Sequence, residues 1–112
     1  MTTTLSDANA LLFNRYVPII QEAQSSGTPD PFSDHPRLSL SNLLWMCQTG
    51  GDQAAQMPDD KASRWLGFVQ GCLAMRMMID VDEERDVTRP LFHKVHQNRT
   101  GETPVTLSRD GT

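Results

Sequence analysis

The chain has 112 residues, of which 38% are hydrophobic and 21% are charged, and its formal net charge at pH 7 is −4. This length allows one domain with one modest hydrophobic core. The negative charge argues against general nucleic-acid binding, which needs a basic surface to displace counterions, but it does not exclude a small anion held at one local cationic site.

The first predicted helix follows a short polar tail at residues 1–5. Ser6 is a suitable N-cap, and apolar side chains then recur at helical spacing along one face. We expect Pro18 to kink or divide this helix, because proline removes a backbone donor and crowds the preceding turn. Gly27 ends the helix, and the prolines at 28–36 predict an irregular loop.

The second predicted helix begins at Ser39 or Ser41, both good N-caps, and buries a leucine-rich stripe. Gly50 and Gly51 weaken its continuation, since each glycine costs about 1 kcal/mol relative to alanine inside a helix. The following AspGlnAlaAlaGln nevertheless favours helix. We therefore expect a distorted helix that continues through the two glycines.

The third predicted helix, at about 58–79, is the longest, and we expect the others to pack around it. Pro58 suits its first position, and Asp59 and Asp60 in the first turn favour the helix dipole. At about 100° per residue its side chains separate into three faces. The first face is broadly apolar and consists of Ala62, Trp65, Leu66, Val69, Cys72, Leu73 and Met77. The second face is made mostly of small residues and consists of Ser63, Gly67, Gly71, Ala74 and Met78. The third face is cationic at its start and apolar beyond, and it consists of Lys61, Arg64, Phe68, Met75 and Ile79.

The fourth predicted helix has Asp80 or Asp82 as its N-cap and further acidic residues in its first turns. We expect Pro90 to kink or divide it. From residue 98 the composition turns polar, so we expect a flexible C-terminal tail at 98–112. The predicted fold is therefore all-α: one compact domain at 6–97, a bundle of about four helices around the helix at 58–79, with flexible termini.

Few residues form a pattern that indicates catalysis, and we expect no enzyme activity, no cofactor and no bound metal. His93 and His96 stand three apart, a spacing compatible with two metal ligands, but no motif supplies a third. Cys47 and Cys72 fall on apolar helix faces, which predicts free thiols in a reducing compartment. No window approaches the roughly 18 consecutive apolar residues of a membrane-spanning helix, and the N-terminus lacks signal-peptide features.

Cations near the start of the third helix give the main functional hypothesis. Lys61 and Arg64 oppose the helix dipole there, and residues placed against local preference are candidates for function. Arg85 and Arg89, four apart on the next helix, would face them if the two helices packed antiparallel. With Trp65 beside Lys61 as a stacking surface, these residues predict a binding site for a small phosphorylated ligand. The alternative is that neighbouring carboxylates neutralise the cations in surface ion pairs.

The small-residue face of the third helix predicts close contact with another helix. Gly67 and Gly71 together cost about 2 kcal/mol of helix propensity, and close backbone approach would compensate for this. One reading is packing against the first or fourth helix of the same chain. The other is a contact between subunits of a homo-oligomer.

Two stretches, DKASRWLGFVQG at 60–71 and ERDVTRPLFH at 84–93, resemble small uncharacterised proteins of tailed bacteriophages that contain an RWLGFxQG stretch after an Asp-Lys pair. The resemblance covers about residues 38–96 and assigns no catalytic residue. It implies a phage origin and action in the host cytoplasm. The leading hypothesis is an accessory protein that counteracts host defence by sequestering a small phosphorylated ligand, such as a nucleotide immune signal. The alternatives are an inhibitor that occupies a host protein, and a virion or replication accessory protein.

Overall fold

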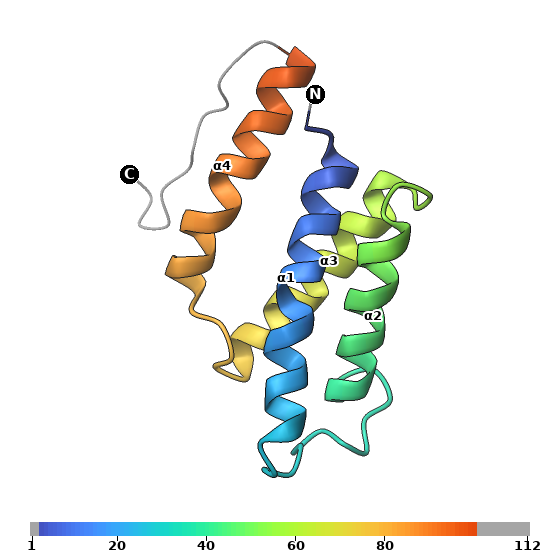
Figure 1. Cartoon of the computed structure of the whole chain (residues 1–112), viewed down its shortest axis with the longest axis vertical. Helices are drawn as coiled ribbons and strands as arrows, with labels where there is room; N and C mark the ends of the chain where they lie inside the picture. The colour runs from blue at the N-terminus through green and yellow to red at the C-terminus, as the bar shows by residue number, and fades with distance from the viewer. Residues whose placement is uncertain (1–2, 101–112) are drawn as a thin grey trace.

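A computed structural model of the protein describes residues 3–100, with side chains up to residue 97. It contains four helices: α1 (Leu5–Ser25), α2 (Leu40–Gln53), α3 (Asp59–Met75) and α4 (Val81–Thr100). Helices α1 and α2 lie side by side, α3 crosses them obliquely, and α4 runs along the other side of α1 (Figure 1). The predicted all-α fold of four helices is confirmed, and residues 3–100 form no strand.

Helix α1 begins with a capping box at Thr4. The Thr4 hydroxyl accepts a hydrogen bond from the Asp7 N–H at 3.1 Å, and the Asp7 carboxylate accepts one from the Thr4 N–H at 3.0 Å. The prediction of Ser6 as N-cap is wrong because this reciprocal pair satisfies two backbone donors earlier in the chain. Pro18 lies inside α1 without dividing it, and Gly27, at φ +80°, follows the helix.

Helix α2 begins after Ser39, whose hydroxyl accepts from the backbone N–H of Asn42 at 3.2 Å. It continues through Gly50 and Gly51, as predicted, but it ends at Gln53 and residues 54–56 form a turn, so the predicted helix over 52–56 is wrong in its second half. The neighbouring α1 accounts for the glycines. A Cβ on Gly50 would lie 2.5 Å from the ring of Phe13, and a Cβ on Gly51 would collide with Asn14. The two glycines therefore allow α1 and α2 to pack closely.

Helix α3 ends at Met75, before the predicted end at Ile79. Met77 adopts a left-handed conformation (φ 60°), and the N–H groups of Met77 and Met78 donate to the carbonyls of Ala74 and Leu73, as in a Schellman motif. Because the helix has already ended, Met77 points into solvent with 92% of its surface exposed. Its predicted place on the apolar face is wrong.

Helix α4 begins after Asp80, whose carboxylate accepts from the Glu83 N–H at 3.0 Å. Pro90 does not divide it, and the helix continues to Thr100, beyond the predicted domain end at residue 97. The predicted N-terminal tail is helical from Leu5. Residues 1–2 and 101–112, which hold most of the predicted flexible tails, lie outside the described residues.

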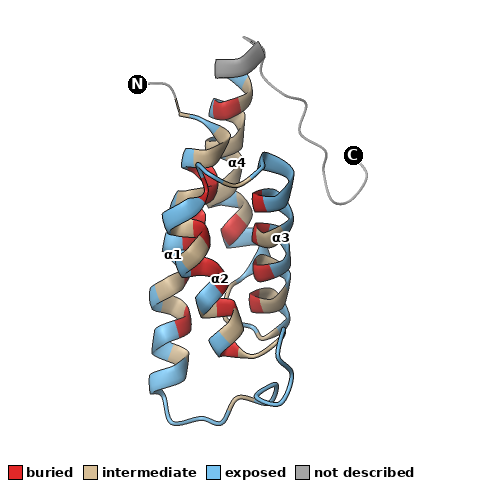
Figure 2. Ribbon diagram, turned by 90° about the vertical axis from the view of Figure 1, so that its right-hand side faces the viewer, coloured by how far each residue is buried: buried red, intermediate tan, exposed pale blue. Residues whose placement is uncertain are grey.

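The hydrophobic core lies among α1, α2 and α3 (Figure 2). Its fully buried apolar side chains include Leu12, Phe13, Tyr16, Ile20, Leu43, Cys47, Val69 and Leu73. Helix α1 contacts each of the other three helices, most extensively α2. The centre of the bundle is therefore α1 and not α3, which buries a single stripe and leaves its opposite face in solvent.

Candidate functional site

Helix α3 turns one face to solvent along its whole length. We call this set of residues the α3 outer face: Asp60, Lys61, Arg64, Gly67, Phe68, Gly71 and Met75, all exposed. At about 100° per residue they fall within an arc of roughly 120°, on the side opposite the buried stripe. The buried stripe consists of Ala62, Leu66, Val69 and Leu73. Figure 2 shows the division, with buried residues on the inner side of α3 and exposed ones on its outer side.

The two glycines of the α3 outer face touch no other helix. A Cβ on Gly67 or on Gly71 would meet no described atom within 4 Å. For these two glycines, close packing against α1 or α4 is therefore the wrong alternative. A contact between subunits through Gly67 and Gly71 remains a prediction.

Gly71 lies between two hollows of the surface. The first has a volume of about 240 Å³ and is lined by Phe32, Leu38, Gly71, Cys72, Met75 and Arg76. The second has a volume of about 260 Å³, lies between α3 and α4, and is lined by Gln70, Gly71, Ala74, Ile79, Val81, Glu84, Arg85 and Thr88. A side chain at position 71 would occupy part of both. Phe68 and Met75, 39% and 86% exposed, flank Gly71 along the helix.

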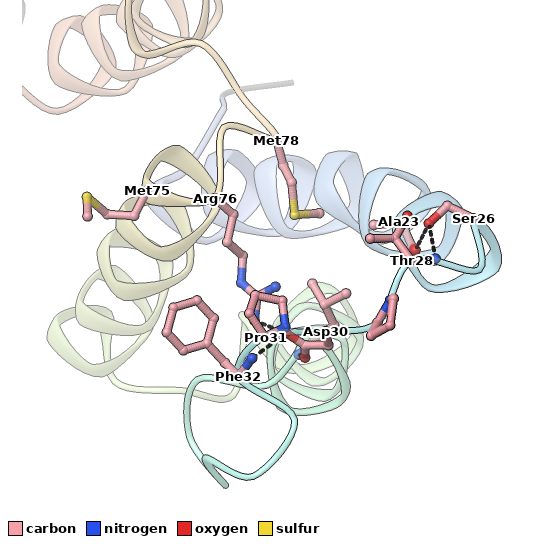
Figure 3. A pocket seen from close by; sticks show the side chains of 11 residues that line it. Ala23, Ser26, Thr28, Asp30, Pro31, Phe32, Met75, Arg76 and Met78 are labelled. Carbon is pink, nitrogen blue, oxygen red and sulfur yellow. Dashed lines mark hydrogen bonds and ion pairs between the residues drawn. The ribbon is translucent and has the colours of Figure 1, made fainter.

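An ion pair fixes the loop at 28–36 to the end of α3. Arg76 places one guanidinium nitrogen 2.9 Å from the Asp30 carboxylate and donates to the Leu38 carbonyl at 2.7 Å. Its guanidinium carbon lies 4.9 Å from the centre of the Phe32 ring. Figure 3 shows Arg76 reaching from α3 toward Asp30 with Phe32 beside it, at a cavity of about 300 Å³. This anchor holds Phe32 as one wall of the first hollow.

The electrostatics of Asp30 follow from its partners. Burial of the carboxyl opposes ionisation, but hydrogen bonds from the backbone N–H groups of Leu40 and Phe32, together with Arg76, outweigh it. The pKa of Asp30 is therefore lower than its ordinary value. This anchor cannot be predicted from local sequence patterns, because its two charged residues lie 46 positions apart.

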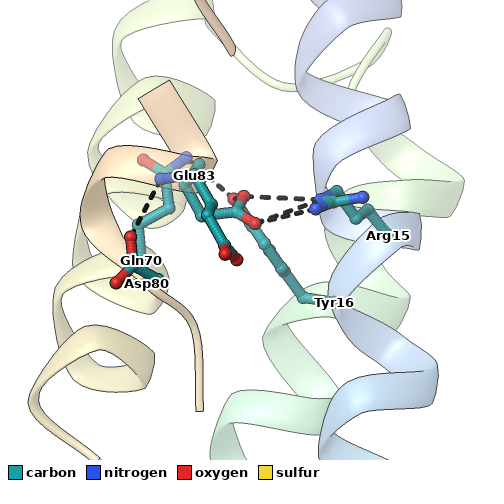
Figure 4. Close-up of polar contacts among 6 residues, drawn as sticks. Arg15, Tyr16, Gln70, Asp80 and Glu83 are labelled. Atoms are coloured by element: carbon teal, nitrogen blue, oxygen red, sulfur yellow. Dashed lines mark hydrogen bonds and ion pairs between the residues drawn. The ribbon is translucent and has the colours of Figure 1, made fainter. Parts of the chain in front are cut away.

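A second polar network joins α4 to the bundle (Figure 4). Glu84 is 8% exposed, and its carboxylate accepts from the Arg15 guanidinium and from the Tyr16 hydroxyl, both at 2.8 Å. The Tyr16 hydroxyl in turn accepts from the side-chain amide of Gln70 at 3.0 Å. Burial raises the pKa of Tyr16, so this hydroxyl stays protonated, and the hydrogen bond to Glu84 raises the pKa of Arg15. The sequence predicts that acidic residues in the first turns of this helix favour its dipole, whereas the structure buries Glu84 between helices.

The predicted cationic residues of α3 lie together at its start. The Lys61 ammonium lies 5.4 Å from the centre of the Trp65 ring, which contacts Trp45 at a centroid distance of 5.5 Å and an interplanar angle of 47°. We call Lys61, Trp65 and Trp45 the lysine–tryptophan cluster. Arg64 lies 3.5 Å from Asp60, with both side chains more than two-thirds exposed. The ion-pair alternative therefore describes Arg64, whereas Lys61 stacks on an indole.

The predicted cations of α4 do not join this cluster. Arg85 pairs with Asp82 at 4.0 Å and lines the second hollow beside Gln70 and Gly71. The α3 residues that line this hollow are Gln70, Gly71 and Ala74, so Arg85 lies near the C-terminal end of α3. Lys61 is ten residues before Gly71, or about 15 Å along the helix at about 1.5 Å per residue. Arg89 lies one turn further from the start of α4, and the structure does not gather the predicted residues into one site.

The described part of the chain offers few other residues that could bind a metal ion or act as nucleophiles. Within it, no group of three or more His, Cys, Asp or Glu side chains is arranged to hold a metal ion, so His93 and His96 gain no third ligand there. Cys47 and Cys72 are free thiols, and burial raises the pKa of Cys47 to about 12. Burial also raises the pKa of Cys72. Between residues 3 and 100 no helix combines the length and the apolar character that crossing a membrane requires.

Comparison of the chain with protein-family models, with curated proteins and with solved structures finds no match. The resemblance to bacteriophage proteins therefore remains a prediction. Function has to be argued from the surfaces of the molecule, and two of them stand out: the α3 outer face and the lysine–tryptophan cluster.

Proposed function

We propose that this chain is a non-enzymatic accessory protein that acts by binding another protein through the α3 outer face. The observation that carries the proposal is the exposure of Phe68 and Met75 beside Gly67 and Gly71, which have no described atom near their Cβ positions. The C-terminal half of this face carries exposed apolar side chains next to an apolar hollow, and such a surface is typical of one on which a helix docks. The resemblance to phage proteins supports an accessory role in the cytoplasm of a bacterial host.

The surroundings of this face favour a preformed binding surface. The Arg76–Asp30 ion pair, with side chains 9% and 15% exposed, fixes Phe32 on one side. The hydrogen bonds of Glu84 to α1 fix the start of α4 on the other side. A surface whose walls are held in this way loses little conformational entropy when a partner binds.

Site-specific photo-crosslinking tests the proposal. Phe68 is replaced by p-benzoylphenylalanine, and the chain is irradiated in bacterial cells that produce it. The matched control carries the same group at Gln24, an exposed position of α1. We expect crosslinked species from position 68 and none from position 24. Equal labelling from both positions, or none from position 68, would show that the α3 outer face binds no protein.

The lysine–tryptophan cluster favours a second candidate function, the sequestration of a small phosphorylated ligand such as a nucleotide signal of host defence. Trp45 is 55% exposed and lies against Trp65, so a base has an aromatic surface on which to stack, and Lys61 beside it can attract a phosphate. Of the predicted ligand-binding residues, Lys61 and Trp65 belong to this cluster, and Arg64 is an exposed cation one turn after Lys61 on the same helix.

Calorimetry with cyclic and linear nucleotides tests the second candidate. Arg64→Ala should weaken binding roughly ten- to a hundredfold, the loss of one charge-assisted contact. The melting temperature should stay unchanged, because Arg64 is 70% exposed and its partner among the described residues is an exposed carboxylate. If the wild-type chain binds no nucleotide at high micromolar concentration, this candidate is wrong. If Arg64→Ala unfolds the protein, Arg64 has a structural role.

A further inference from the structure

We propose that the partner of the α3 outer face is a second copy of this chain, bound across a two-fold axis that crosses α3 between Val69 and Gln70. The two α3 helices then pack antiparallel through their outer faces. This inference rests on the proposed function, since it names the occupant of the same surface.

The first argument is that the α3 outer face is complementary to itself. A two-fold contact needs one surface in which each protrusion meets a depression on the other copy. With the axis at this position, Phe68 of one chain lies opposite Gly71 of the partner subunit, and the reverse contact follows by symmetry. The exposed Phe68 ring would enter the surface at Gly71, where two hollows meet and no side chain projects. Glycine at this point also lets the two backbones approach closely.

The second argument is charge. The start of α3 carries two exposed cations, Lys61 and Arg64, and two exposed carboxylates, Asp59 and Asp60, so it has no net charge. The turn after the end of α3 leads to further exposed carboxylates, among them Asp80 and Glu83. A parallel contact would place the acidic turns of the two copies together, whereas an antiparallel contact places each acidic turn near the uncharged start of the other α3 and opposes the two helix dipoles favourably. In the described part of the chain Lys61 has no carboxylate within ion-pair distance, so its charge is open to a partner.

The size of the face sets the strength that we expect. Helix α3 has 17 residues and is therefore about 26 Å long, at about 1.5 Å per residue. A contact centred on one helix of this length falls below the roughly 800 Å² per partner of a standard stable interface. We therefore expect a reversible dimer with a dissociation constant in the micromolar range, not a permanent one.

Sedimentation velocity over a range of micromolar concentrations tests this inference on the full chain. The wild type should shift from monomer to dimer as its concentration rises. Gly71→Leu should weaken the dimer at least tenfold, because the new side chain fills the hollows that receive Phe68. The monomer should stay folded, because a Cβ at position 71 meets no atom within 4 Å. Gln24→Leu adds the same side chain to an exposed position of α1 and should dimerise like the wild type.

The photo-crosslinking result separates this inference from the proposed function. If position 68 crosslinks the chain to itself and Gly71→Leu abolishes the dimer, the proposed function and the second-copy inference are both supported. If the wild type stays monomeric and position 68 crosslinks a different protein, the second-copy inference is wrong while the protein-binding function stands. If a dimer forms and Gly71→Leu leaves it unchanged, the interface lies elsewhere and the inference is likewise wrong. A monomer that crosslinks nothing contradicts both.

Discussion

Replacing helical glycines with alanine should have opposite effects at Gly50 and Gly71. Alanine is favoured over glycine inside a helix by about 1 kcal/mol, so a position with free space should gain stability. At Gly71 no atom lies within 4 Å of the new Cβ, and we expect the free energy of unfolding to rise by about 0.5–1 kcal/mol. At Gly50 the new Cβ would lie 2.5–2.7 Å from three ring atoms of Phe13, which is fully buried and has no room to retreat.

Overpacking of this kind costs about 1–3 kcal/mol, so the net change for Gly50→Ala should lie between roughly zero and a loss of 2 kcal/mol. Urea denaturation followed by far-ultraviolet circular dichroism measures both variants, at protein concentrations low enough to keep the chain monomeric. Gly51→Ala should cost less than Gly50→Ala, because the new Cβ would meet the far end of the exposed Asn14 side chain, which can move aside. The reasoning is refuted if Gly71→Ala destabilises the monomer, or if both substitutions stabilise it equally.

Three further substitutions test the polar contacts, each by urea denaturation. Glu84→Gln should lower the free energy of unfolding by about 1–2 kcal/mol. The loss should be smaller than for a fully buried ion pair, because the Arg15 side chain is 39% exposed. An unchanged free energy of unfolding would show that the network does not hold α4. The pKa of Asp30 is depressed in the folded state, so its contribution to the free energy of unfolding is present above its ordinary pKa of 3.8 and is lost as pH falls through the folded value. Asp30→Asn should therefore be less stable than the wild type at neutral pH, and its free energy of unfolding should fall less on acidification. Parallel pH profiles of the two proteins would contradict this. Neither amide atom of the buried Asn9 has a hydrogen-bond partner among the described residues, so Asn9→Leu should raise stability by about 1–2 kcal/mol, whereas a loss would reveal a satisfied amide.

Local signals in the sequence were sufficient to predict the four helices. Ser39 and Asp80, each one of two predicted candidates, cap their helices, because a cap depends on a side chain and a backbone N–H three residues away. The start of α1 was misplaced because Thr4 and Ser6 are both good caps, and only the Thr4–Asp7 pair forms the reciprocal box. Element boundaries of this kind depend on a few competing hydrogen bonds.

The role of the helical glycines could not be predicted from local sequence patterns. From the sequence, Gly67 and Gly71 needed a neighbouring helix to compensate for their cost, whereas Gly50 and Gly51 only weakened a helix. The structure reverses this: α1 packs against Gly50 and Gly51, and the described chain places nothing against the other pair. Helix propensity is the same at all four positions, so only the packing of α1 on α2 distinguishes them.

The exposure of individual side chains and the pairing of distant residues could not be predicted from the sequence either. Phe68 has the same apolar character as the buried core residues, and hydrophobicity alone does not show which side of α3 faces solvent. Arg15 and Glu84 are 69 positions apart, and neither stands in a motif that indicates a partner. Arg85 and Arg89 would face Lys61 and Arg64 only if α3 and α4 packed antiparallel, whereas α4 packs mainly against α1.

The α3 outer face as a binding surface is tested most directly by native mass spectrometry of the wild-type chain and of Gly71→Leu, each purified from bacterial cells that produce it. We expect the wild type to give an ion at twice the mass of the chain, in addition to the monomer, and Gly71→Leu to give the folded monomer alone. A wild-type chain that is monomeric and free of any partner contradicts the proposal. A monomer that retains a phosphorylated small molecule also contradicts it, and such a result would place binding at Lys61 and Trp65 instead.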